Sequence, residues 1–556
     1  MKEPPLVFTR RRFLGGLAIV GTAPVWSQFD ALAWAQSEGR FSGDDLELAH
    51  RLLFDPEQTL ASGTPELDPA RYDVLVIGGG IAGLTVAYRL RDRKLLLLER
   101  DPEVGGVSKC ENWQGIEYAS GAAYIIDPAA DSEDPREAAG FALLEELGLR
   151  ARGEDLERDR SRQRRLSGDA NHVLFSNRKV LSESDAYSRS NRKFFEQVLD
   201  SDHYPSVPPT DKELVAALDR LSFAAFLRDK ALQKRIYGKT VGKISPLGWE
   251  AIEYYCWGAF GTSATEASAY HGLNFFAAEY GDILVFPGGN GFISRRLGER
   301  IARHNPRAIR TGAWVLRIER DGDGWAATTW EKGILRRYRA RCVVYASPLF
   351  LAPKLIPSLP ASQRQAIATL DYRAYVVANV LLRRPANRVF PAAAFQDGYE
   401  LTRVHGVDPF REGAEKLNGA KVFSDAILAD FATDRHPSHA VLTVYRPYPY
   451  ADGRAALMSA SYAEIEAEVR REVLAGFAAH GLRAEDIEGV RLARWGHPMI
   501  ITRPGQLIDG TLERATQPQP GLFYAHTDVT GSPAYENALA AAHDAVAAVE
   551  QHLRPS

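Results

Sequence analysis

The feature that most constrains this 556-residue chain is a glycine-rich turn between two short apolar runs. Residues 72–77 and residues 95–98 are each typical of a buried parallel strand. Between them, residues 78–83 (GGGIAG) lead directly into a helical pattern over residues 84–90. A lone glycine motif is weak evidence, but the order strand, turn, helix, strand predicts a βαβ unit that binds a dinucleotide.

The residues of this turn each have a physical task in such a unit. Gly78 makes the tight turn, Gly80 lets the backbone approach a pyrophosphate, and Gly83 lets helix and strand pack closely. The helix begins at Ile81 and Ala82, where free N–H groups and the positive end of the helix dipole favour phosphates.

An acidic residue closes the second strand. Glu99, followed by Arg100, stands about 20 residues beyond the glycines, where a carboxylate binds the ribose hydroxyls of an adenosine. These features alone leave NAD possible. The pair Gly105-Gly106 follows shortly after, and this pattern resembles the superfamily of flavin amine oxidases, phytoene desaturases and protoporphyrinogen oxidases. The resemblance implies FAD as the cofactor.

The resemblance continues along the chain. Residues 287–291 (PGGNG) are similar to the family's second glycine-rich landmark. It implies that the backbone of Val315 lies against the adenine, and that Thr527 or Asp528 meets the ribityl chain near the last helix. The expected cofactor-binding residues are Gly78, Gly80, Ile81, Ala82, Gly83, Glu99, Arg100, Gly105, Gly106, Val315, Thr527 and Asp528.

The resemblance also implies the domain organisation of an α/β chain. We expect a Rossmann-like FAD-binding domain with an inserted α+β substrate domain, much of whose first segment looks helical. The FAD domain is assigned to residues 71–130, 282–350 and 485–553, and the substrate domain to 131–281 and 351–484. Residues 36–70 form an N-terminal extension, with one helix expected over residues 44–53.

The first 35 residues resemble a twin-arginine signal peptide. Residues 9–14 (TRRRFL) precede a mildly apolar stretch, and small-residue cleavage sites lie within residues 31–35. This predicts export by the twin-arginine machinery and a periplasmic or secreted location. The alternative is a basic, disordered N-terminus.

Composition removes several classes of function. A formal net charge of -3 argues against a nucleic-acid partner, and no apolar run is long enough for a spanning helix. The three cysteines, Cys110, Cys256 and Cys342, have no spacing typical of a disulfide framework or zinc site. We found no motif for a metal and expect none.

Lys354 is the first catalytic candidate. It lies six residues after Pro348, and in flavin amine oxidases a lysine at this spacing hydrogen-bonds a water beside the flavin N5. A buried cation there would stabilise reduced flavin or assist its reaction with oxygen. The alternative is a surface lysine between domains.

His497 is the second candidate. Counted back from Pro504-Gly505, it occupies the position of the flavin-linking cysteine of monoamine oxidases, and Pro498 replaces the neighbouring tyrosine. Without that cysteine we expect non-covalent FAD. His497 is either a proton acceptor near the flavin or a residue that shapes the turn.

Tyr535 is the third candidate. Amine oxidases of this family hold the substrate between two aromatic side chains, the cage. Pro498 stands at the first of these two positions and Ala534, one residue before Tyr535, at the second, so both positions lack their tyrosine. Residues 254–260 (YYCWGAF) either line the substrate cavity instead or pack in a core.

The leading hypothesis is an exported FAD-dependent oxidase or dehydrogenase. It would remove hydride from a small or apolar organic substrate, such as an amine, and pass electrons to oxygen or another acceptor. The missing cage favours a second hypothesis, a carotenoid- or isoprenoid-type desaturase or isomerase. A third is a catalytically silent periplasmic flavoprotein.

Overall fold

The first sheet of the computed structural model contains the expected βαβ unit. The structure describes residues 39–129, 132–150, 164–167, 172–181, 189–407, 409, 423–432 and 436–554, so the expected signal peptide lies outside the described residues. Strands β2, β3, β10, β13 and β19 run parallel, and β11, β12 and β13 form an antiparallel meander. The sheet order is β10 (Ile309–Arg310), β3 (Leu95–Leu98), β2 (Glu66–Ile77), β13 (Ile334–Tyr345), β12 (Gly324–Glu331) and β11 (Trp314–Asp321), with β19 (Leu522–Tyr524) beside β13.

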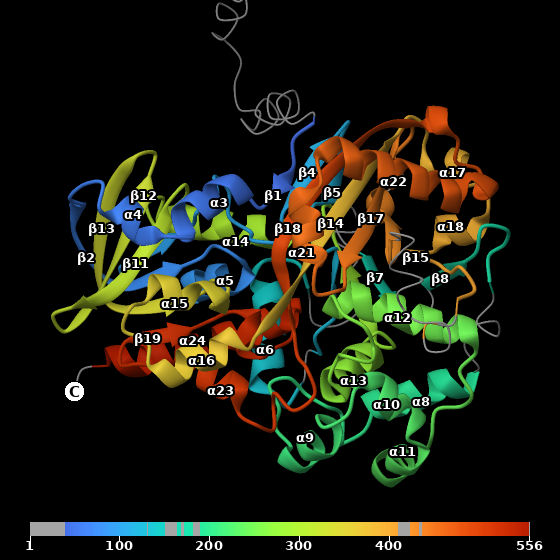
Figure 1. The fold of residues 1–556 in the computed structure, drawn as a ribbon, viewed down its shortest axis with the longest axis horizontal. Helices are drawn as coiled ribbons and strands as arrows, with labels where there is room; N and C mark the ends of the chain where they lie inside the picture. Colours follow the sequence, from blue (N-terminus) through green and yellow to red (C-terminus); the bar gives the residue numbers. More distant parts are fainter. Residues whose placement is uncertain are drawn as a thin grey trace, which may run out of the picture. The chain divides into compact units, whose positions relative to one another are not determined.

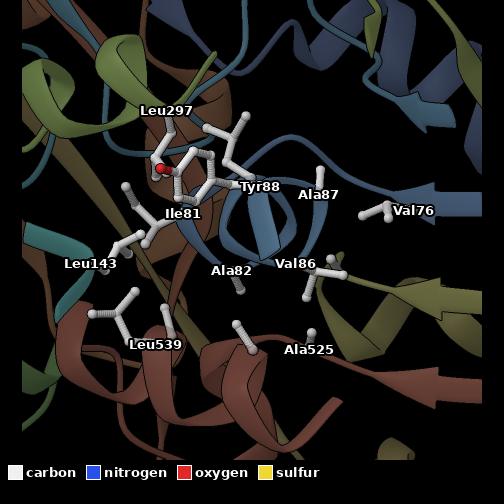
Figure 2. Packing of buried hydrophobic residues seen from close by; sticks show 14 of the residues in the cluster. Val76, Ile81, Ala82, Val86, Ala87, Tyr88, Leu143, Leu297, Ala525 and Leu539 are labelled. Carbon is white, nitrogen blue, oxygen red and sulfur yellow. The ribbon is translucent and has the colours of Figure 1, made fainter. Parts of the chain in front are cut away.

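Helix α5 (Ile81–Arg89) packs against this sheet and is buried from its first residue to Tyr88. A helix that is apolar on all sides must be covered on all sides. Figure 2 shows how: Leu297 of α14 (Gly291–His304) and Leu539 of α24 (Tyr535–Leu553) approach α5 from different directions. The glycine turn before α5 is therefore held on a rigid base.

The second sheet is built mostly from the middle of the chain. Its strands alternate between two buried faces: Val376 and Leu442 pack on α22 (Tyr462–Phe477), while Tyr375 and Tyr445 face a cavity. Figure 1 shows α22 and α12 (Pro246–Phe260) on opposite sides of this sheet. The order is β1 (Ser42–Gly43), β18 (Ile487–Ile501), β14 (Asp371–Leu382), β17 (Ala440–Tyr448), β16 (Asp425–Leu428), β15 (Glu400–Arg403) and β8 (His172–Phe175).

A group of helices lies below the second sheet in Figure 1, in the region expected to be helical. Aromatic side chains such as Phe195, Phe226 and Phe276 form its core. The helices are α8 (Arg189–Leu199), α9 (Lys212–Leu218), α10 (Phe223–Arg228), α11 (Lys230–Tyr237), α12 (Pro246–Phe260) and α13 (Ala269–Ala278).

Smaller elements join these parts. These are a three-stranded sheet, a hairpin and further helices. They are β6 (Tyr124–Ile126), β9 (Asp282–Val285) and β7 (Arg164–Ser167); β4 (Cys110–Trp113) and β5 (Ile116–Ala119); and α6 (Pro135–Glu146), α15 (Ala352–Leu355), α16 (Ala361–Ala368) and α23 (Thr511–Ala515). Among the described residues, no helix has the length and apolar character needed to cross a membrane.

Two boundaries differ from those expected. Strand β18 pairs with β14 over its length, so residues 487–501 belong to the second sheet and not to the third FAD segment that was expected to start at 485. The N-terminal extension holds α3 (Leu46–Leu53) as expected, but also β1, α4 (Pro56–Leu60) and the start of β2. Strand patterns alone do not reveal which sheet a strand joins.

Candidate functional site

The glycine turn forms a cradle that fits a dinucleotide. Gly78 has a φ of +112°, and a Cβ there would overlap the carbonyl oxygen of Ala346. A Cβ at Gly83 would overlap the carbonyl oxygen of Gly78. A side chain at either position is therefore excluded. Helix α5 starts after Gly80 without a side-chain cap, so its first N–H groups remain free for phosphate oxygens.

The structure brings the second glycine pair and the acid to the same place. The Gly105 N–H donates to the carbonyl of Gly79 at 2.7 Å, and a Cβ at Gly106 would lie 3.1 Å from the Cα of Gly80. The Glu99 carboxylate accepts from the Gly79 N–H at 2.6 Å. The residues that are expected to contact the phosphates and the ribose thus lie together at the carboxyl ends of β2 and β3.

Two further expected residues lie next to Glu99. Arg100 forms an ion pair with Asp44, and its guanidinium lies 5.6 Å from the centroid of the Trp314 ring. The carbonyl of Glu99 accepts from the Ala313 N–H at 2.8 Å, which places the start of β11, and with it Val315, beside the acid. Val315 is buried there, and its contact with the adenine stays a prediction.

Asp528 is held by contacts within the protein. The Asp528 carboxylate is buried and accepts from the Leu349 N–H at 2.8 Å and the Tyr372 hydroxyl at 2.6 Å. Burial opposes its ionisation, but His526 and these donors hold the pKa of Asp528 below its usual range. Protein groups thus already engage this carboxylate, and the contact of Thr527 or Asp528 with the ribityl chain stays a prediction.

The structure contains a cavity of about 400 Å³ that borders Val107, the residue after Gly105-Gly106. Its walls come from residues 121–126, from α12 and α13, from the second sheet, and from the start of α24. The sheet wall is a strip that crosses six strands, and its side chains are His172, Glu400, Asp425, Ile427, Tyr445, Tyr375, Val377 and Trp495. Tyr254 and Tyr255 of α12 also line the cavity, whereas Cys256, Trp257 and Phe260 pack in hydrophobic cores, so residues 254–260 serve both roles that were considered.

Six acidic residues and Arg136 line this cavity, and three of the acids, Glu279, Glu400 and Asp425, act on one another electrostatically. Glu279 accepts from the hydroxyls of Tyr124 at 2.7 Å and Tyr255 at 3.3 Å. Asp425 accepts from the Ser424 hydroxyl at 2.5 Å. Glu400 lies 3.7 Å from the Nε2 of His172. None of these acids could be singled out in the sequence, because they come from distant parts of the chain.

Burial and mutual repulsion keep protons on these groups. Burial, followed by repulsion from Glu400, raises the pKa of Glu279 and of Asp425 to about 8. Burial raises the pKa of Glu400 itself to about 7 and lowers the pKa of His172. The cluster can therefore take up or release protons near neutral pH, and a bound cation would favour its ionised form.

The comparison with protein families decides the identity of the chain. Residues 81–549 match the family described as flavin containing amine oxidoreductase. The chain belongs to this family. It is therefore a flavin-dependent oxidoreductase, and the cradle around Gly78–Gly83 is consistent with the cofactor that this family uses.

Individual relatives agree with this assignment. Oxidoreductase PigB of Serratia sp. (strain ATCC 39006) is 22% identical over 542 residues, which cover 87% of this chain and 75% of that protein. The structure of putrescine oxidase bound to putrescine is similar with a TM-score of 0.59 and 16% identity, covering 87% of this chain and all of that one.

A structure with a different activity shares the fold as well. The CLA-producing fatty acid isomerase from P. acnes has a TM-score of 0.55 and 14% identity, with 87% of this chain and 99% of that one covered. These likenesses confirm the expected α/β fold of the amine oxidase type.

Lys354 does not meet the cavity. Its Nζ donates to the carbonyl of Phe54 at 2.9 Å and lies 4.6 Å from the centroid of that ring, which is exposed. The residues after Pro348 form a 3-10 turn and then α15, which directs Lys354 to the surface. The position of Lys354 gives no support to the role beside N5 that its spacing suggested.

His497 lies behind the cavity wall. It stacks on Phe350 with ring centroids 4.1 Å apart, while the next residues, Pro498 and Met499, line the cavity. Burial, followed by repulsion from Arg454, lowers the pKa of His497 to about 4, so its imidazole is neutral. A neutral ring packed on an aromatic neighbour fits the structural alternative better than proton transfer.

Tyr535 is the one catalytic candidate that borders the cavity. It is buried, as the first residue of α24, and its hydroxyl has no hydrogen-bond partner among the described residues. Its neighbour Glu536 also lines the cavity and accepts from the Ile126 N–H at 2.7 Å. Ala534, the position at which the second cage aromatic was expected, lines the cavity as well.

Proposed function

We propose that this protein is an FAD-dependent oxidoreductase that removes hydride from an organic amine bound as a cation. The observation that carries the proposal is the group of three carboxylates, Glu279, Glu400 and Asp425, facing one tyrosine-lined cavity. In their ionised form these carboxylates repel one another, and a bound cation would relieve that repulsion. Aromatic ring faces around the cavity attract the same cation.

The chain's own residues would prepare the amine for oxidation. An ammonium ion must lose a proton before the adjacent C–H bond can be broken as hydride. A carboxylate with a pKa of about 7 to 8, such as Glu400 or Asp425, is a suitable acceptor at neutral pH. The bound flavin supplies the two-electron acceptor for the hydride.

FAD is proposed as the specific cofactor because the cradle is followed by an acid placed for an adenosine ribose. Gly78, Gly80 and Gly83 would hold the pyrophosphate, and Glu99 the ribose. We propose non-covalent binding, since the three cysteines, which all lie in described segments, do not border the cavity. The reduced cofactor would pass electrons to oxygen or another acceptor.

The acidic cavity also separates the rival hypotheses. A fatty acid would bring its own carboxylate to Glu279, Glu400 and Asp425, and Arg136 of the lining is already paired with Asp544. A polyene would leave these groups protonated and would make no use of their charge. Both are poorer partners for this cavity than an amine. A silent flavoprotein would need no such cavity.

The test is anaerobic bleaching of the flavin absorbance in FAD-reconstituted protein. We expect reduction by members of a panel of primary and secondary amines and none by apolar alkenes. Bleaching or product formation only with fatty acids or polyenes would favour the isomerase or desaturase hypothesis. An oxidised spectrum with every compound would favour the silent flavoprotein.

Export is proposed from the sequence of the first 35 residues. Replacing both Arg10 and Arg11 by Lys should keep the protein in the cytoplasm, because twin-arginine signals require the arginine pair. Arg12→Lys, outside the pair, is the control and should be exported normally. Cell fractionation measures the outcome, and export of the double variant would contradict the proposal.

A further inference from the structure

An N-terminal strap, defined as residues 41–60, joins the two sheets. Strand β1 pairs in parallel with β18, with Ser42 opposite Ala493 and Gly43 opposite Arg494. Gly43 has a φ of +87°, and a Cβ there would lie 2.5 Å from the carbonyl oxygen of Arg494. The strap therefore fits closely along the edge of the second sheet.

Asp44 is the point at which the strap passes from one sheet to the other. Its N–H donates to the Arg494 carbonyl at 2.8 Å, and its Oδ2 accepts from the Gly496 N–H at 2.8 Å. Its Oδ1 forms an ion pair with Arg100, the second residue after β3. One carboxylate, 14% exposed, thus connects β18 with the nucleotide-binding turn.

The rest of the strap is anchored on the first sheet. Leu52 and Leu53 of α3 are buried in the same cluster as Trp314 and Val315 of β11. Helix α4 adds an ion pair between Glu57 and Arg317. Figure 1 shows α3 and α4 beside β11.

This path follows the expected course of the cofactor. In sheets of this type, ligands bind outside the carboxyl ends of the parallel strands. Arg100 stands just beyond the end of β3, and Gly496 precedes His497, which stacks on Phe350 just beyond the end of β13. Glu99, the expected ribose ligand, is adjacent to Arg100.

We propose that Asp44 is a positioning residue for the adenosine half of the cofactor. By holding Arg100 between the strap and Trp314, it fixes the turn that carries Glu99 and keeps the dinucleotide from leaving at that end. This inference rests on the proposed binding of FAD. It does not depend on the substrate.

The test compares FAD with FMN, which lacks the adenosine monophosphate half. In full-length apoprotein, Asp44→Asn should raise the dissociation constant for FAD about tenfold, a loss of about 1.4 kcal/mol, and leave that for FMN unchanged. Asp44→Ala should weaken FAD binding at least as much. Asp45→Asn is the matched control, because Asp45 only caps α3 by accepting from the Leu48 N–H, which Asn also does.

A double-mutant cycle tests whether Asp44 acts through Arg100. Arg100→Gln should weaken FAD binding, and adding Asp44→Asn should cost little more. Unchanged FAD affinity in Asp44→Asn, or an equal loss for FAD and FMN, would overturn the inference. Wild-type protein that binds FAD without amine-dependent bleaching contradicts the proposed substrate alone, and wild-type protein that binds no FAD contradicts both proposals.

Discussion

Glu400 on β15 and Asp425 on β16 are neighbours across two paired strands, and both face the cavity. Glu400 is paired with Ile427, so Asp425 lies diagonally opposite on the same face. After burial, repulsion from Glu400 is the main cause that raises the pKa of Asp425 to about 8. The same carboxylate acts on Glu279 from across the cavity.

This relationship predicts a shift in the pH profile of amine oxidation. In the wild type, kcat/KM should rise between about pH 6 and 8.5, as the carboxylates ionise and attract the ammonium. Glu400→Gln removes the charge that raises the pKa of both Glu279 and Asp425. The rising limb should therefore move to lower pH by up to about one unit, with a lower plateau because one anion is lost.

Steady-state kinetics across pH measure this shift. Glu513→Gln, which changes an exposed glutamate of α23, is the matched control and should leave the profile in place. A limb that stays at the wild-type pH in Glu400→Gln would show that the cluster does not govern substrate binding.

The same carboxylates should affect stability. A carboxyl whose pKa is raised on folding is easier to ionise in the unfolded chain, so its contribution favours the folded state at low pH and is lost as pH rises. For Glu400, with a pKa of about 7, the loss should accumulate between about pH 4.5 and 7. Glu400→Gln removes this penalty.

Urea unfolding of the apoprotein can detect the effect. At pH 8, Glu400→Gln should be more stable than wild type by roughly 1–3 kcal/mol, and at pH 4.5 the two should be close. Equal stability of the two proteins at both pH values would mean that the Glu400 pKa is not raised in solution.

The nucleotide cradle was predictable because its parts are adjacent in the sequence. Gly78 to Gly83, Glu99 and Gly105-Gly106 lie within one βαβ unit, and each has a spacing set by backbone geometry. The structure places them together around the start of α5. Because these residues are close together in the sequence, their arrangement can be predicted without knowledge of the rest of the fold.

The cavity carboxylates were not predictable for the opposite reason. Glu279 follows α13, while Glu400 and Asp425 each open a short strand, where an acid looks like an ordinary strand end. Only the register of β15 on β16, and the packing of α13 against β6, brings them together. Lys354 shows the reverse failure, since its spacing matched a family pattern but a short helix directs it away.

The cradle yields a matched pair of glycine variants. Gly83→Ala should abolish or severely weaken FAD binding, because the new Cβ would overlap the Gly78 carbonyl and force the turn apart. Gly63→Ala is the control: its Cβ would meet no atom within 4 Å, and its φ is not in the left-handed region. Flavin fluorescence titration separates the two, and normal FAD binding by a folded Gly83→Ala protein would contradict the assigned cradle.

The position of Lys354 leads to a clear expectation for Lys354→Met. If the lysine stood beside N5, its loss would slow flavin reduction or reoxidation by orders of magnitude. In the structure its Nζ meets only the exposed strap at Phe54, so both rates should stay within about twofold of wild type, and the loss of stability should be below about 1 kcal/mol. Stopped-flow measurement of reduction by amine and reoxidation by oxygen provides the comparison. A large fall in either rate, with FAD still bound, would mean that Lys354 reaches the flavin in a conformation other than the one described.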